Sequence, residues 1–156
     1  MPTSPPDEDA VPTDGAPERD KWLETYRESR QATAMEPHDV ELIDVDADQI
    51  ILEMSIGDHA RQPYGLLHGG VSLLLAESAA SMHACWGVDL DEKLPVGIEV
   101  NCSHIDSARE GTVRAVGRVI KRGRTLIRHR VEIIHRESGR LLSDIRVTNL
   151  YKSVEG

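Results

Sequence analysis

Cysteine and long apolar runs are scarce in this sequence. Only two of the 156 residues are cysteine, Cys85 and Cys102, which is too few for a disulfide framework. We interpret them as buried thiols in a reducing compartment. The chain also has no apolar run of about eighteen residues and no apolar signal-peptide core near its start. We therefore expect no membrane-spanning helix and predict a cytoplasmic protein.

Several catalytic and metal-binding motifs are missing as well. The seven histidines include no His-x-x-x-His pair and the cysteines no Cys-x-x-Cys pair, so no metal site is predicted. A Gly-x-Ser-x-Gly sequence is absent too, which leaves a serine-hydrolase mechanism without its motif. The net charge of −9 argues against general binding to nucleic acids or to anionic membranes.

The first twenty residues differ in composition from the rest of the chain. They hold five of the eight prolines and six acidic residues against one arginine, a net charge of −5. Such a segment buries too little apolar surface to order itself, so we predict that residues 1–20 are a disordered acidic tail. Residues 21–156 are long enough for one hydrophobic core, and we predict a single domain there.

The remaining sequence predicts one long helix among antiparallel strands. Apolar residues at helical spacing predict a short amphipathic helix from Lys21 to about Ala34. The segment from Val71 to about Trp86 is rich in Leu and Ala and predicts a helix buried on most sides. Alternating apolar residues predict strands at about 40–45, 50–56, 96–102, 113–120, 125–135 and 141–151. This order predicts an α+β fold in which an antiparallel sheet of five to six strands wraps the long helix.

A loop containing proline and glycine leads into the long helix. It delivers His68, Gly69 and Gly70 to the start of the helix, where paired glycines let the backbone come close to a bound group. The first amide N–H groups of a helix have no internal partner and point outward at the positive end of its dipole. This end therefore suits a carbonyl oxygen that gains negative charge during a reaction.

One carboxylate, Glu77, is set into the otherwise apolar helix, with Ser81 one turn later on the same face. A glutamate here either reaches solvent at the rim of the helix or serves a site, and the preceding loop favours a site. Gly69 and Glu77 are eight residues apart, roughly 12 Å along one helix. Both can act on one carbonyl only if Glu77 comes from a second subunit. The sequence thus predicts a homodimer with its sites at the interface.

The loop and helix together resemble a known family. Gln62, the His68-Gly69-Gly70 run, Glu77 and Ser81 have the spacing of the hotdog-fold acyl-CoA thioesterases, and the resemblance extends from about residue 38 to residue 151. The branch it is most similar to includes the phenylacetate-pathway, 4-hydroxybenzoyl-CoA and 1,4-dihydroxy-2-naphthoyl-CoA thioesterases. The resemblance implies a hotdog fold and a homodimer or a tetramer made of dimers. It also implies hydrolysis of an aromatic or hydroxyaromatic acyl-CoA, with coenzyme A as part of the substrate and no further cofactor.

The resemblance also implies catalytic roles for five residues. The Gly69 amide would bind the thioester oxygen, and His68 and Gln62 would orient that end of the site. Glu77 would be the nucleophile, through a mixed anhydride, or the general base for water, and Ser81 would hold the water or bond the carboxylate. Each residue also has a simpler interpretation. His68 would cap the loop, Gln62 would brace the turn, and Ser81 would bond back to the Glu77 carbonyl.

Substrate-binding residues are expected in three further places. Arg122, Gly123 and Arg124 form a basic turn that would suit the phosphates of coenzyme A, and the resemblance assigns this region to the nucleotide end. The alternative is an ordinary solvated turn. His104 lies at the end of a predicted strand and is a further candidate. The acyl pocket is expected to involve the long helix as far as Met82 and the strand around Val96.

Two other functions on the same fold remain as alternatives. One is a non-catalytic hotdog module that binds acyl-CoA. It is less favoured because binding alone needs no carboxylate beside an amide donor and a serine. The other is a dehydratase, whose typical motifs are absent from this sequence.

Overall fold

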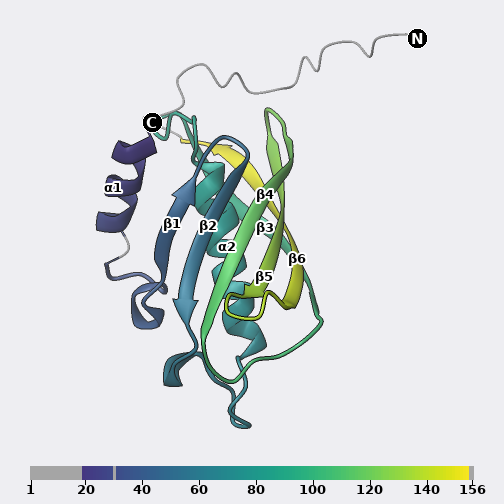
Figure 1. Ribbon diagram of the computed structural model, residues 1–156. Coiled ribbons are helices and arrows are strands. Elements are labelled where there is room, and N and C mark those ends of the chain that lie inside the picture. The colour runs from purple at the N-terminus through teal and green to yellow at the C-terminus, as the bar shows by residue number, and fades with distance from the viewer. Residues whose placement is uncertain (1–18, 30, 155–156) are drawn as a thin grey trace, which may run out of the picture.

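The computed structural model describes residues 19–29 and 31–154 (Figure 1). Residues 1–18 of the predicted tail lie outside the described residues. Arg19 and Asp20, which the sequence analysis assigned to the tail, instead begin helix α1, Arg19–Ser29. The prediction that this helix reaches Ala34 is wrong. Ala32 has a φ of 57°, in the left-handed region, which a right-handed helix cannot continue through.

Helix α1 packs through one apolar face, as its spacing predicted. Leu23 is buried, and the ring of Trp22 stacks on Tyr26 with 5.0 Å between centroids. Trp22 also meets the edge of Trp86 at 5.6 Å. These contacts hold α1 beside strand β1 at the edge of the sheet (Figure 1).

The other helices and the strands follow in the predicted order. The strands are β1 (Glu41–Val45), β2 (Gln49–Ser55), β3 (Lys93–His104), β4 (Thr112–Arg122), β5 (Leu126–His135) and β6 (Leu141–Ser153). The short 3-10 helices η1 (Glu36–His38) and η2 (Asp58–Ala60) flank the first hairpin, and α2 (Gly69–Ala84) follows. The six strands form one sheet in the order β1-β2-β4-β5-β6-β3, with every pair antiparallel. This confirms the predicted α+β arrangement.

Helix α2 lies against one face of this sheet (Figure 1) and packs on β2 to β6. Small residues make the close approach possible, since Ala76, Ala79 and Ala80 are completely buried. The strands turn alternate apolar side chains toward the helix, for example Ile50, Leu52 and Met54 of β2, which are all buried. No helix in the described part of the chain is long and apolar enough to span a membrane.

Strand β3 forms one edge of the sheet. It pairs with β6 along one side, and no described strand pairs with its other side. The register shifts between Gly97 and Glu99, so one extra residue is accommodated there. Leu94, Val96 and Ile98 are 46%, 39% and 55% exposed. A long edge strand with exposed apolar side chains is a surface that proteins normally cover.

Candidate active site

His68 caps the N-terminus of α2. The loop before it is fixed by backbone bonds from His68 N to Ala60 O and from Leu67 N to Ala108 O, both 2.8 Å. His68 is extended, and its Nδ1 accepts from the Gly70 amide at 2.8 Å. The helix therefore begins at Gly69, two residues earlier than predicted, because the imidazole binds one of its N-terminal amides. With Nδ1 as acceptor, the neutral ring carries its proton on Nε2.

Gly69 lies directly against His104, from the far end of strand β3. A Cβ at position 69 would lie 2.6 Å from His104 Nε2, so only glycine permits this approach. The other ring nitrogen, Nδ1, is 2.8 Å from the hydroxyl of Ser143, which is buried on β6. The structure thus brings one predicted binding residue, His104, to the amide end of α2.

Gln62 braces the loop, as its simpler interpretation held. Its Oε1 accepts from the Tyr64 amide, and its backbone bonds to Leu66 O and Gly65 N at 2.8 and 2.9 Å. Gly65 completes this tight turn with a φ of 81°. The Gln62 amide nitrogen has no hydrogen-bond partner among the described residues, so this donor is available to a ligand.

Glu77 is exposed in the single chain, although half of the residues of the long helix around it are buried. Its carboxylate lies over strand β3, where a Cβ on Gly97 would come within 2.5 Å of Glu77 Oε1. It forms no hydrogen bond or ion pair with any described residue. Within one chain, Glu77 and Gly69 lie about two turns apart on the same helix. The structure therefore does not bring them to a common point in one chain.

Ser81 bonds to a residue that the sequence analysis missed. Its Oγ donates to Oδ1 of Asn149 at 3.0 Å, so the alternative bond to the Glu77 carbonyl is wrong. Asn149 lies on β6 opposite Gly97 and is completely buried. One signal for it was present, since Ile145, Val147 and Tyr151 are apolar at the same alternating positions of β6 and Asn149 is polar.

Arg122 is a structural residue in this chain, which corrects its assignment to the phosphates. Its guanidinium donates to His83 O at 3.4 Å and Trp86 O at 3.3 Å, and to the Tyr151 hydroxyl at 3.0 Å. These carbonyls belong to the C-terminal end of α2, where a cation is favourable. The residue points inward because the β4–β5 turn lies beside that end of the helix.

Gly123 and Arg124 do face solvent at the basic turn. They line a surface hollow of about 290 Å³ together with Lys121, Thr125, Leu126 and Arg128. Three cationic side chains therefore border one concave site. Because neighbouring Arg122 contacts the C-terminal end of α2, this hollow and Gly69 lie at opposite ends of the helix in one chain.

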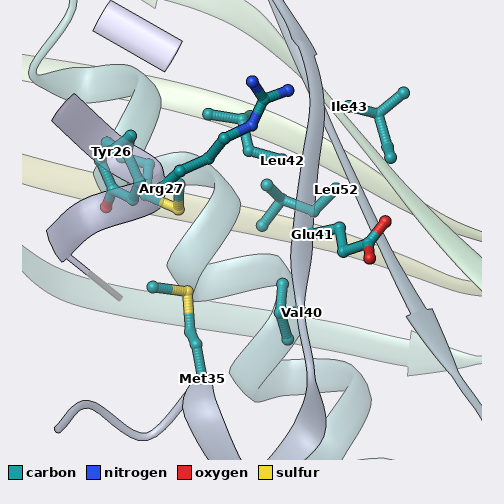
Figure 2. A pocket seen from close by; sticks show the side chains of 9 residues that line it. Tyr26, Arg27, Met35, Val40, Glu41, Leu42, Ile43 and Leu52 are labelled. Carbon is teal, nitrogen blue, oxygen red and sulfur yellow. The ribbon is translucent and has the colours of Figure 1, made fainter. Parts of the chain in front are cut away.

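Met82 and Val96, which were both expected at the acyl pocket, are not brought together in one chain. Met82 is buried and lines a separate cavity of about 400 Å³ between α1, β1 and β2, where Tyr26 and Leu42 also point (Figure 2). Five residues of helix turn Met82 about 140° away from Glu77. Val96 is on the edge strand β3, beyond the opposite side of α2.

Both cysteines are free and half-buried, rather than buried as predicted. Burial raises the pKa of the Cys85 thiol to about 11, and it also raises the pKa of Cys102. A thiol with a raised pKa is a poor nucleophile at neutral pH. Neither cysteine is therefore placed as a catalytic group.

Comparisons with known proteins agree with this arrangement. Residues 64–142 match the model of the Thioesterase superfamily. The 1,4-dihydroxy-2-naphthoyl-CoA hydrolase of Escherichia coli is 36% identical over 110 residues, which cover 70% of this chain and 79% of that protein. A crystal structure of a mutant thioesterase from Pseudomonas aeruginosa has a TM-score of 0.81 and 30% identity, covering 85% of this chain and 94% of that one. A Haemophilus influenzae thioesterase has a TM-score of 0.80 at 28% identity, covering 86% and 92%.

A long helix packed into a six-stranded antiparallel sheet, with a histidine-capped amide end, defines a hotdog-fold enzyme. The chain belongs to the Thioesterase superfamily, which confirms the resemblance found in its sequence. It is a thioester hydrolase.

Proposed function

We propose that the protein hydrolyses an acyl-CoA whose acyl group is aromatic or hydroxyaromatic. The observation that carries this proposal is the layout of α2, which presents amide donors at Gly69 and an unpaired carboxylate at Glu77. The similarity to the 1,4-dihydroxy-2-naphthoyl-CoA hydrolase of Escherichia coli supports the substrate class. Medium-chain acyl groups are the alternative within the same chemistry.

The proposed active unit is a homodimer, alone or within a tetramer made of dimers. The free edge of β3, with Leu94, Val96 and Ile98 exposed, would pair with the same edge of a second chain about a two-fold axis. Such a pairing is antiparallel. It would carry Glu77 of the partner subunit toward the amide end of the first chain's α2.

In this dimer the thioester oxygen would accept from the Gly69 amide, with the Gln62 amide nitrogen and His68 orienting that end. In the general-base route, Glu77 of the partner subunit takes a proton from water as the water oxygen bonds to the acyl carbon. The C–S bond then breaks, and the proton passes to the coenzyme A thiolate. In the nucleophilic route, the carboxylate bonds to the acyl carbon first, and water hydrolyses the mixed anhydride.

The phosphates of coenzyme A are proposed to bind the basic hollow of Lys121, Arg124 and Arg128. Since this hollow and Gly69 lie at opposite ends of one chain, a coenzyme A that contacts both would bridge two chains. This requirement and the position of Glu77 point to the same oligomeric site.

Thiol release from a panel of acyl-CoAs tests the proposal. The panel pairs benzoyl, phenylacetyl and hydroxylated aromatic thioesters with hexanoyl and palmitoyl thioesters. We expect turnover of an aromatic substrate, and a loss of about 100-fold or more in kcat for Glu77→Gln. Glu110→Gln, an exposed glutamate in the loop before β4, is the matched control and should match wild type. If wild type binds these thioesters without releasing thiol, the non-catalytic binding module replaces the enzyme.

A further inference from the structure

Asn149 is a buried polar residue beside the candidate carboxylate. It is completely buried, and its Oδ1 accepts from the Ser81 hydroxyl at 3.0 Å. Its Nδ2 is also buried and has no partner among the described residues. A leucine of similar volume would avoid the cost of that unpaired donor, but it would not accept a hydrogen bond from Ser81.

The side chains of Asn149 and Glu77 both lie next to Gly97 of strand β3. A Cβ at position 97 would lie 2.5 Å from Glu77 Oε1 and 3.7 Å from Asn149 Oδ1, so the two oxygens flank the same backbone position. Ser81 is one helical turn from Glu77 and bonds to Asn149 from the same side. Carboxylate, hydroxyl and amide thus converge over one glycine of strand β3.

The direction of the Ser81 hydrogen bond limits what this hydroxyl can do. A hydroxyl has a single proton, and that of Ser81 is donated to Asn149. Ser81 therefore has only lone pairs to offer its other neighbours. It cannot donate to the Glu77 carboxylate while this bond persists, but it can accept from a water molecule.

We propose that Asn149 is a positioning residue that keeps Ser81 an acceptor, so that Ser81 and Glu77 together hold the attacking water. The water donates one hydrogen to Ser81 Oγ and the other to the Glu77 carboxylate, which leaves a lone pair for the acyl carbon. As the O–C bond forms, Glu77 takes the second proton, and it returns that proton when the C–S bond breaks. This inference rests on the proposed thioesterase function and selects the general-base route within it.

A double-mutant cycle between Asn149 and Ser81 tests this role. We expect Asn149→Leu and Ser81→Ala each to lower kcat between about 10- and 100-fold, with KM within about threefold of wild type. Because Asn149 acts through Ser81, the double variant should be no slower than Ser81→Ala alone. Losses that add in the double variant, or an Asn149→Leu enzyme with the wild-type kcat, would overturn the proposal.

Two further measurements separate positioning from a general disturbance of β6. Thr148→Val, a buried, nearly isosteric change at the neighbouring position, should keep the wild-type kcat. If Asn149→Leu does not fold, NMR provides the test. The side-chain amide resonances of Asn149 must shift between wild type and Ser81→Ala if the two side chains are coupled. Absence of thiol release from wild type overturns the proposed function, and this inference with it. If wild type releases thiol normally but Asn149 and Ser81 are not coupled, only this inference is overturned and the proposed function stands.

Discussion

His83 and His129 share a hydrogen bond inside the core, and their protonation is fixed by a backbone carbonyl. His83 Nε2 lies 2.7 Å from Asp46 O, which can only accept, so this nitrogen carries the proton. His83 Nδ1 then accepts from His129 Nε2 at 2.8 Å. Burial is the main cause that lowers the pKa of His83 to about 4 and of His129 to about 3. Both rings are therefore neutral in the folded protein.

This pair predicts that stability falls on acidification. Below the ordinary histidine pKa of 6.5, these two histidines bind protons in the unfolded chain but stay neutral in the folded chain. The free energy of unfolding therefore decreases as the pH falls from 6.5 toward 4. We expect a loss on the order of 2 kcal/mol per buried histidine between pH 7.5 and 5, measured by urea unfolding.

The control for this prediction replaces the titrating groups. The double variant His83→Gln, His129→Leu should show a shallower dependence of stability on pH, whatever its stability at pH 7.5. His59→Gln, an exposed histidine on η2, is the matched comparison and should keep the wild-type slope. An unchanged slope in the double variant would assign the acid sensitivity to other groups.

At the scale of elements, the two ends of α2 are capped by different side chains. His68 binds an amide at the N-terminus, and Arg122 binds carbonyls at the C-terminus. Arg122 is the last residue of β4, where the β4–β5 turn begins, so this bond also ties the helix to the sheet. Helix and turn therefore depend on each other for their positions.

Arg122 and Arg124 should differ in what their loss changes. Arg122→Ala removes charge-assisted bonds at the helix end, and we expect it to lower the free energy of unfolding by about 1–3 kcal/mol. Arg124→Ala, two residues away at the solvent-facing hollow, should change stability by less than about 0.5 kcal/mol but raise KM for an acyl-CoA. Thermal unfolding and KM, measured for both variants, separate the two roles. Equal stability of the variants would remove the capping role.

Local patterns in the sequence predicted the helices and strands. They did not predict the contacts between elements that are far apart in the sequence. Alternation and helical spacing are properties of neighbouring residues, so the hairpin, the helix and the later strands were predicted correctly. The bond from Ser81 to Asn149 joins residues 68 positions apart, and Arg122 turned inward because of where α2 ends. Such pairings depend on strand order and register, which residue spacing does not contain. Residue spacing did predict that His68, Gly69 and Glu77 lie along one helix, because positions within a helix depend only on neighbouring residues.

At the scale of the whole molecule, the proposed site is incomplete in one chain. Gly69 and Glu77 belong to the same helix and stand too far apart along it to act on one carbonyl carbon. In the proposed dimer, the free edge of β3 with its exposed apolar residues is the surface through which a second chain would supply the missing group. Each dimer would then hold two sites, and each site would take one residue from each chain.

Complementation between two inactive variants tests this arrangement. Glu77→Gln removes the carboxylate. Gly69→Pro removes the amide donor at the first helical position, where the backbone tolerates proline and His68 is already extended. Its Cβ also displaces the His104 ring, so the variant inactivates the amide end of the site by both routes and leaves Glu77 in place. A mixed dimer has one site with both changes and one with neither. Random mixing by joint refolding gives half mixed dimers, so we expect about a quarter of the wild-type activity from two preparations that are each inactive.

The same mixture discriminates between a shared and a single-chain site. If Gly69 and Glu77 of one chain formed the site together, every chain in the mixture would carry one defect and no activity would return. Mixing each variant with itself under the same refolding conditions is the control. Purification through a different affinity tag on each variant isolates the mixed dimer, whose activity should be about half that of wild type because one of its two sites is intact.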